Sequence, residues 1–228
     1  VSGVADALTL TVEAASGAED SAIALDITSS LSDTDGSETL SLTVTGIPDG
    51  AILSAGTLND DGSVTLTPGQ LDGLTITPPA DSSADFNLTI TATTSEDGTS
   101  ATTSSTLEVT VSGVADTPSV TVNAASGAED SAIALDITSS LSDTDGSETL
   151  SLTVTDIPEG AILSAGTLND DGSVTLTPEQ LDGLTITPPA DSSADFNLTV
   201  TATSSEDGTQ ATTSSTLEVT VSGVADTP

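Results

Sequence analysis

The sequence consists of two nearly identical copies of one unit. The segment AASGAEDSAIALDITSSLSDTDGSETLSLTVT begins at Ala14 and again at Ala124, which is a period of 110 residues. Comparing residues 1–118 with residues 111–228 gives 107 identical pairs and 11 differing ones. This period is longer than the roughly 20–50 residues of solenoid repeats, and it matches a single β-sandwich domain of about 100 residues. The repeat therefore predicts tandem domains.

A short phrase marks the joints between the copies. VSGVAD occupies residues 1–6, 111–116 and 221–226, so the chain begins and ends within this phrase. We interpret the chain as two repeats of a longer array. The predicted boundaries are a partial linker at 1–6, a first repeat at 7–113, a linker at 114–118, a second repeat at 119–223 and the start of the next linker at 224–228.

Apolar residues alternate with Thr, Ser and Asp along each copy. Examples are Leu8, Leu10 and Val12, then Leu40, Leu42 and Val44. Alternation with a period of two indicates strands that have one face on a core and one face in water. Turn signals separate about seven such runs, so we expect an all-β chain of two tandem Ig-like (cadherin-like) β-sandwich domains, about seven strands each, arranged end to end. We also expect one helical turn at 67–71, and Phe86 and Phe196 in the cores.

The charge composition excludes many function classes. The chain has 36 acidic residues and no Lys, Arg or His, and it also lacks Cys, Met, Trp and Tyr. Without cations it cannot neutralise phosphates, and without His, Cys or Lys it cannot assemble the usual nucleophiles or zinc sites. No run approaches the ~18 apolar residues of a membrane span. We therefore expect no enzyme, nucleic-acid partner, membrane insertion or small-molecule substrate, but a monomer whose partners are the neighbouring repeats of the same chain.

Chain direction predicts where the acidic turns lie. We call the end where the chain enters a domain its entrance end, and the opposite end its exit end. Strands that run back and forth place the turn after the second strand and the last hairpin turn at the entrance end. In the first repeat the acids of these turns are Asp33, Asp35, Glu38, Glu96 and Asp97, and Asp6 of the linker phrase joins them. The first turn and the approach to the sixth strand lie at the exit end, which places Glu19, Asp20, Asp81 and Asp85 there, with Glu129 and Asp130 in the second repeat.

Joining two domains brings the acids of both ends to one junction. Up to ten carboxylates are expected there, namely Glu19, Asp20, Asp81, Asp85, Asp116, Asp143, Asp145, Glu148, Glu206 and Asp207. No basic side chain can pair with them, and like charges placed close together must be protonated or bridged. Ca²⁺ takes about 6–8 oxygen ligands in flexible geometry, whereas Mg²⁺ keeps its waters and requires a strict octahedron. The sequence therefore predicts several Ca²⁺ ions at and near the junction.

Several motifs recur after 110 residues and carry a family resemblance. They are Ala-Glu-Asp at 18–20, Asp-Thr-Asp-Gly at 33–36, Asp-Gly-Ser-Val-Thr-Leu-Thr-Pro at 61–68, Ala-Asp-Phe at 84–86 and Val-Ala-Asp-Thr-Pro at 114–118. Together they resemble the cadherin-like, Ig-like extender repeats of giant bacterial RTX adhesins. The resemblance implies calcium at the domain junctions, with Glu129, Asp116, Asp143 and Asp145 in ligand roles. It also implies a calcium-rigidified spacer that is secreted, through type I secretion, to the bacterial cell surface and that projects an adhesive tip.

Three other interpretations remain open at this stage. A calcium-dependent ligand-binding module, lectin-like or ice-binding, is the alternative to a spacer, although the chain lacks the Trp and Tyr that stack on sugars. A hydrolase that uses a carboxylate pair would fit the many Asp pairs. A disordered acidic stalk would fit the charge and the low aromatic content.

Overall fold

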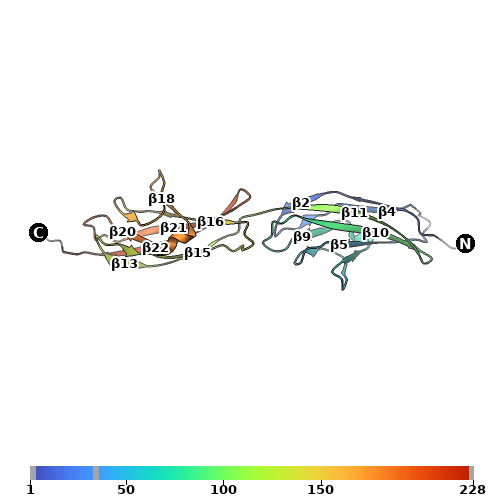
Figure 1. Ribbon diagram of the computed structural model, residues 1–228, viewed down its shortest axis with the longest axis horizontal. Coiled ribbons are helices and arrows are strands. Elements are labelled where there is room, and N and C mark those ends of the chain that lie inside the picture. Colours follow the sequence, from blue (N-terminus) through green and yellow to red (C-terminus); the bar gives the residue numbers. More distant parts are fainter. Residues whose placement is uncertain (1–3, 33–35, 226–228) are drawn as a thin grey trace. The chain divides into compact units, whose positions relative to one another are not determined.

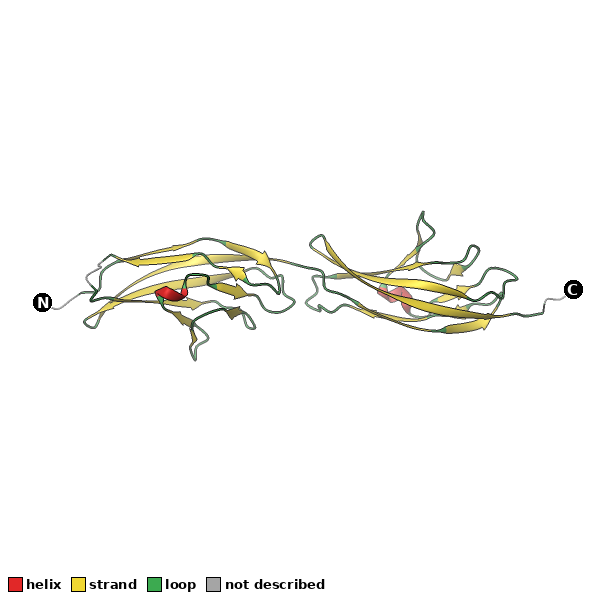
Figure 2. Ribbon diagram, turned by 180° about the vertical axis from the view of Figure 1, so that it is seen from behind, coloured by secondary structure: helices red, strands yellow, loops and turns green. Residues whose placement is uncertain are grey.

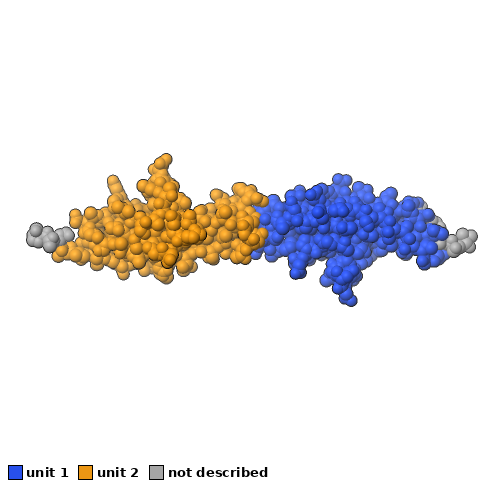
Figure 3. Space-filling view, viewed as in Figure 1, with its two compact units in different colours: residues 1–113 blue, residues 114–228 orange. Residues whose placement is uncertain are grey.

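The computed structural model describes residues 4–32 and 36–225. The chain divides into two compact units, Val1–Gly113 and Val114–Pro228 (Figure 3). Each unit consists of strands and one helical turn (Figure 2). The helical turns have three and four residues, so the described part of the chain has no helix that could cross a bilayer.

The first unit is a sandwich of two layers. Its elements are β1 (Leu8–Val12), β2 (Ala15–Ala18), β3 (Ile23–Ala24), β4 (Ile27–Leu31), β5 (Thr39–Thr45), β6 (Ile52–Leu53), β7 (Thr57–Leu58), β8 (Val64–Leu66), η1 (Pro68–Gln70), β9 (Thr75–Thr77), β10 (Phe86–Glu96) and β11 (Thr99–Ser112) (Figure 1). One layer is a six-stranded sheet in the order β2-β11-β10-β5-β8-β7. The pair β1-β4 and the three-stranded sheet β3-β9-β6 form the other layer.

The second unit repeats this architecture. Its elements are β12 (Ser119–Asn123), β13 (Ala125–Ala128), β14 (Ile133–Ala134), β15 (Asp136–Ser140), β16 (Thr149–Thr155), β17 (Ile162–Leu163), β18 (Thr167–Leu168), β19 (Val174–Leu176), η2 (Pro178–Leu181), β20 (Thr185–Thr187), β21 (Phe196–Glu206) and β22 (Thr209–Ser222). Its six-stranded sheet has the order β13-β22-β21-β16-β19-β18, and β12-β15 and β14-β20-β17 form the second layer.

The first strand of each unit changes layers partway along. In the first unit β1 pairs antiparallel with β4, and β2 then pairs parallel with β11, the last strand. The second unit shows the same switch, from β12-β15 to β13-β22. The chain thus ties both layers together soon after it enters each unit.

The alternating apolar residues form the core between the layers. In the first unit Leu42 and Val44 of β5 and Leu88 and Ile90 of β10 are fully buried, and they belong to the same cluster as Ile76 from the other layer. The Thr and Ser residues between them face outward. Each strand thus has one face on the core and one face directed outward, as the alternation predicted.

The predicted all-β, Ig-like sandwich class is confirmed. The described residues form eleven strands in each unit instead of the seven predicted, because the first two strands are each split and the two-residue strands β6 and β7 are added. The helical turn lies at Pro68–Gln70, inside the predicted segment. Phe86 lies at the start of β10 as expected, but it is only partly buried and packs against the core.

A cross-strand pair at the end of the β1-β4 ladder differs between the units. In the second unit Asn123 lies opposite Asp136, and its side-chain amide donates to Asp136 Oδ2 at 2.8 Å. In the first unit two carboxylates take these places, those of Glu13 and Asp26, and the backbone amide of Glu13 donates to the carbonyl of Asp26. The ladder also ends one pair earlier, at Val12 and Ile27.

Exchanging this pair is expected to change stability in opposite directions. Glu13→Asn should stabilise the first unit by about 0.2–1 kcal/mol, because like charges opposite each other on strands are unfavourable. Asn123→Glu should destabilise the second unit by a similar amount. Denaturant unfolding of the full chain measures both effects, and shifts of the same sign would contradict the argument.

Candidate metal centre

The turn before β16 is wound around its own Asp side chains. The amide of Asp145 donates to Asp143 Oδ1 at 2.7 Å, and the amide of Ser147 donates to Asp145 Oδ1 at 2.7 Å. The hydroxyl of Ser147 donates to Asp143 Oδ2 at 3.2 Å. Such local bonds from Asp to the following backbone fix the turn and place its carboxylates.

The linker residues at the start of the second unit are held against this turn. The amide of Asp116 donates to Glu148 Oε1, and the hydroxyl of Ser204 donates to the carbonyl of Asp116. The amide of Ala115 donates to Thr209 Oγ1 at 2.7 Å, and that hydroxyl donates to the carbonyl of Glu206 at 2.8 Å. The linker, the turn before β16 and the β21–β22 turn thus meet at one end of the second unit.

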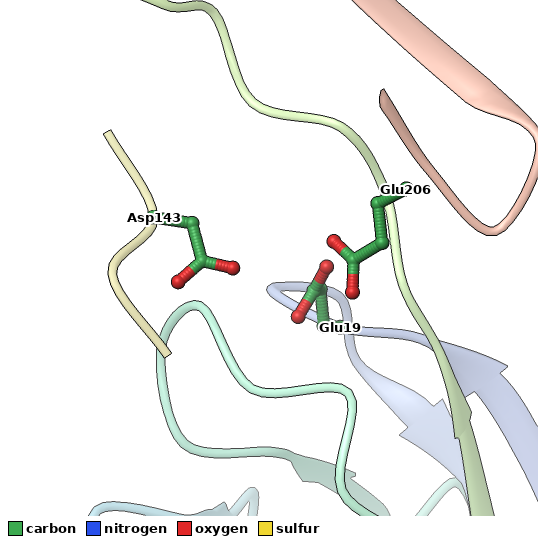
Figure 4. A group of neighbouring side chains, drawn as sticks. All are labelled: Glu19, Asp143 and Glu206. Carbon is green, nitrogen blue, oxygen red and sulfur yellow. The ribbon is translucent and has the colours of Figure 1, made fainter. Parts of the chain in front are cut away.

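Four carboxylates gather at this end, and we call them the entrance cluster: Asp116, Asp143, Glu148 and Glu206. One carboxylate oxygen of Asp143 lies within 4.8 Å of one carboxylate oxygen of Glu206 (Figure 4). The third side chain labelled in Figure 4, Glu19, belongs to the first unit and is described with it below.

Glu148 is one of the buried members of the entrance cluster. Its side chain is 7% exposed, and its Oε2 atom has no hydrogen-bond partner among the residues that the structure describes. Burial raises the pKa of Glu148 above its usual range, and the charges of Asp116, Asp143 and Glu206 raise it further. The amide of Asp116 opposes this shift by donating to the charged form. An ionised Glu148 is therefore costly here unless a cation joins it.

The entrance end of the first unit repeats this arrangement. The amide of Asp6 donates to Glu38 Oε1, and the hydroxyl of Thr94 donates to the carbonyl of Asp6 at 3.0 Å. The amide of Ala5 donates to Thr99 Oγ1 at 2.7 Å, and Thr99 donates to the carbonyl of Glu96. Glu38 is 9% exposed, and its Oε2 atom also has no partner within the described ranges. The predicted ligands Asp33 and Asp35 lie outside the described residues.

The exit ends bring a different set of acids together. In the first unit the amide of Asp81 donates to Asp20 Oδ1 at 3.0 Å, and the two side chains place carboxylate oxygens within 4.8 Å of each other. In the second unit Asp191 donates to Asp130 in the same way, also at 3.0 Å. All four residues have positive φ, between 52° and 55°, a conformation that Asp tolerates better than most residues.

Two further exit-end acids hold backbone segments. Asp85 Oδ1 accepts the amide of Val111 at 2.8 Å, which fixes the end of the last strand. Glu19 joins β2 to that strand, because its amide donates to the carbonyl of Ser112 at 3.0 Å. The corresponding Glu129 is buried, and its Oε1 atom accepts the amide of Val224 at 2.7 Å. Glu129 thereby clasps the chain as it leaves the second unit.

Some acids missed by the sequence reasoning take part in these contacts. Asp195 accepts the amide of Val221 at 2.8 Å, and Asp191 pairs with Asp130 as described above. Their signal was present, because they stand 110 residues after Asp85 and Asp81. Asp97 and Asp207, predicted as ligands, lie exposed in hairpin turns with positive φ, a turn conformation that Asp tolerates, and their role as ligands stays a prediction.

The entrance cluster has the chemistry of a hard-cation site. It offers carboxylate oxygens from three separate segments, and the chain contains no Lys, Arg or His that could neutralise them. Ca²⁺ accepts such oxygen ligands at about 2.3–2.6 Å and tolerates irregular geometry. The buried Oε2 atom of Glu148, which has no hydrogen-bond partner among the described residues, is suited to bind such a cation.

Comparison with known structures finds similar folds at low identity. A structure of Drosophila N-cadherin EC1-4 is 16% identical with a TM-score of 0.44; the match covers 95% of this chain and 50% of that one, so the chain spans half its length. The titin domains z1z2, in complex with telethonin, are 15% identical with a TM-score of 0.33, covering 98% and 100%. The D00-D0 domain of intimin is 14% identical with a TM-score of 0.30, covering 92% and 99%. No protein-family model matches the chain, and no curated protein sequence matches it.

Proposed function

We propose that the two units are structural repeats that bind Ca²⁺ at their entrance and exit ends, and that calcium makes the chain a stiff spacer. The observation that carries this proposal is the buried Glu148 oxygen without a partner, set among the carboxylates of Asp116, Asp143 and Glu206. The same feature at Glu38 in the other unit makes it a property of the repeat.

The linker contacts explain how calcium would affect stiffness. Asp116 is the member of the entrance cluster that belongs to the linker, and its backbone amide donates to Glu148. At the other end of the unit, Glu129 accepts the amide of Val224 on the departing chain. Ions bound at these acids fix the chain where it enters and leaves a unit, so they restrict the linker's backbone freedom. A repeat with both ends fixed suits the role of a spacer that holds another part of the molecule at a distance.

We propose that the parent molecule is a bacterial cell-surface adhesin in which these repeats extend the adhesive tip from the cell. Support comes from the family resemblance of the motifs and from the carboxylates gathered at the ends of the units. On this proposal we expect calcium dissociation constants near 10⁻⁴–10⁻³ M, which are typical of extracellular calcium modules. A chain with a net charge of −36 and no basic residue attracts divalent cations, which an extracellular medium supplies. In this role the repeats lie outside the cell, after type I secretion, and are non-catalytic.

Small-angle scattering of the full chain tests the spacer function. With millimolar calcium we expect a larger radius of gyration and a narrower distribution of interatomic distances than with chelator. The control is chelator with added NaCl at equal ionic strength, which screens charge without coordinating it. Identical scattering in calcium and chelator would refute the proposal.

A further inference from the structure

Large apolar side chains that remain exposed are concentrated at one place in each unit. Val4, Val114 and Val224 belong to the linker phrases. The remaining exposed large apolar residues of the described chain are Ile52, Leu58, Ile162 and Leu168, with exposed fractions between 66% and 73%. Two lie in each unit, at corresponding positions, and both line the same cavity. Exposed apolar patches on a protein surface often mark interaction sites.

We call this cavity the hairpin groove. In the second unit its volume is about 470 Å³, and it lies beside the hairpin of β18 and β19, lined by Ile157, Pro158, Glu159, Ile162, Leu168 and Val174 among others. The hairpin projects from the body of the unit (Figures 1 and 3). The corresponding groove of the first unit measures about 250 Å³ and is lined by Ile47, Ile52, Leu58 and Val64 among others.

Leu168 lies on β18, the edge strand of the six-stranded sheet. Leu168 pairs with Val174, whose side chain is buried, while Leu168 itself is 73% exposed. Gly166 allows the tight approach, because a Cβ atom there would lie 2.4 Å from a methyl group of Val174. The side-chain amide of Asn169 then donates to the hydroxyls of Ser173 at 2.8 Å and Thr175 at 3.0 Å. The exposed position is thus fixed by the fold.

The rim of the groove is acidic. Glu159 lines the groove, and the exposed Asp170 and Asp171 come directly before the lining residue Gly172. Ser173 donates its amide at 3.0 Å and its hydroxyl at 2.6 Å to Asp171 Oδ1, which orients this carboxylate. A second copy of the chain carries the same charge and no cation, so it would be repelled. A cationic partner is attracted by the same field.

We propose that the hairpin groove of each unit binds a partner-protein segment that inserts an aliphatic or aromatic side chain and has Lys or Arg beside it. The apolar side chain covers Ile162 and Leu168, and the adjacent cations face Glu159 and Asp171. In the first unit Ile52 and Leu58 take the place of the two apolar residues. This surface is separate from the candidate metal centre, and its function does not depend on calcium ligation.

Fluorescence anisotropy with a short labelled peptide of alternating Lys and Leu tests the proposal, in calcium and about 0.15 M salt, where surface charges are screened beyond ~8 Å. A peptide of alternating Lys and Ser is the charge-matched probe. We expect the Leu peptide to bind the full chain at least about fivefold more tightly, as expected for a buried apolar contact. Equal binding of both peptides would show non-specific charge attraction and overturn the proposal.

Variants of the exposed residues locate the site. The double variant Leu58→Ser and Leu168→Ser should remove the preference for the Leu peptide, because both side chains are largely exposed and the core stays intact. Val4→Ser removes a comparably exposed apolar residue elsewhere and should leave binding unchanged. Unfolding curves of each variant check the fold. An unchanged preference in the folded double variant would also overturn the proposal.

Discussion

Removing calcium is expected to lower the melting temperature of the chain by roughly 10–20 °C for each ion bound per unit. An ion present at a hundredfold excess over its dissociation constant stabilises the native state by about 2.7 kcal/mol. One kcal/mol shifts the melting temperature of a domain of this size by about 4–8 °C. The loss should be large because the entrance cluster has no other counter-charge. Thermal unfolding followed by circular dichroism, in calcium and in chelator, measures it.

Two controls separate coordination from screening. NaCl at matched ionic strength reduces the self-repulsion of a chain with a net charge of −36, but it cannot bridge Glu148 to its neighbours. Mg²⁺ supplies the same charge with stricter geometry. We expect NaCl and Mg²⁺ each to recover only part of the stability that Ca²⁺ gives. Full recovery with NaCl alone would contradict a coordination site.

Replacing the buried glutamate should have opposite effects with and without calcium. In chelator, Glu148→Gln removes a buried charge and should stabilise the second unit by about 1–3 kcal/mol, the usual cost of an uncompensated buried group. In calcium the same change removes a ligand, so calcium affinity and stability should both fall. Glu38→Gln tests the first unit in the same way. Thermal unfolding with titrated calcium measures both effects.

Glu218→Gln is the matched control, because it removes the same charge from an exposed position on β22. It should change stability little in either condition. If Glu148→Gln destabilised the chain equally in calcium and in chelator, Glu148 would be structural and not a ligand.

The direction in which the stability of the metal-free chain changes with pH follows from Glu148. The folded-state pKa of Glu148 is raised above its unfolded value, so the folded state binds the proton more tightly. Stability in chelator should therefore rise as the pH falls from neutral through the folded pKa, and level off below the unfolded pKa near ~4.3. Glu148→Gln should reduce this rise.

The sequence predicted the fold class and the meeting of acidic segments better than it predicted the role of each acid. Chain direction alone was enough to assign Glu148, Glu206 and the linker to one end, because strands in a sandwich alternate in direction. It could not show that Glu148 is buried, since the direction of a side chain in a turn depends on the backbone there. The position of Asp85 was right, but it binds the amide of Val111, a contact no motif announces.

The hairpin groove was not predictable from the apolar pattern. Leu58 stands between Thr57 and Asn59 just as the core residues stand between polar ones, and Ile52 lies in the apolar run Ala51–Leu53, yet both side chains are exposed. The backbone turns between them at Gly56, with φ of 113°. The split of the first strand was equally hidden, because Leu8–Val12 and Ala15–Ala18 are separated by just two residues.

The parallel pairing of β2 with β11 has a mechanical consequence. The chain enters a unit through β1, which pairs with β4, continues into β2, and leaves the unit at the end of β11. Strands β2 and β11 are hydrogen-bonded neighbours over four pairs, from Ala15–Val109 to Ala18–Ser112. Tension between the two ends of the unit pulls these strands past each other, so all four pairs are loaded together instead of opening one at a time. The β13-β22 ladder of the second unit carries load in the same manner. Each repeat is therefore connected in a shear geometry, in which stretching must break several hydrogen-bonded pairs at once.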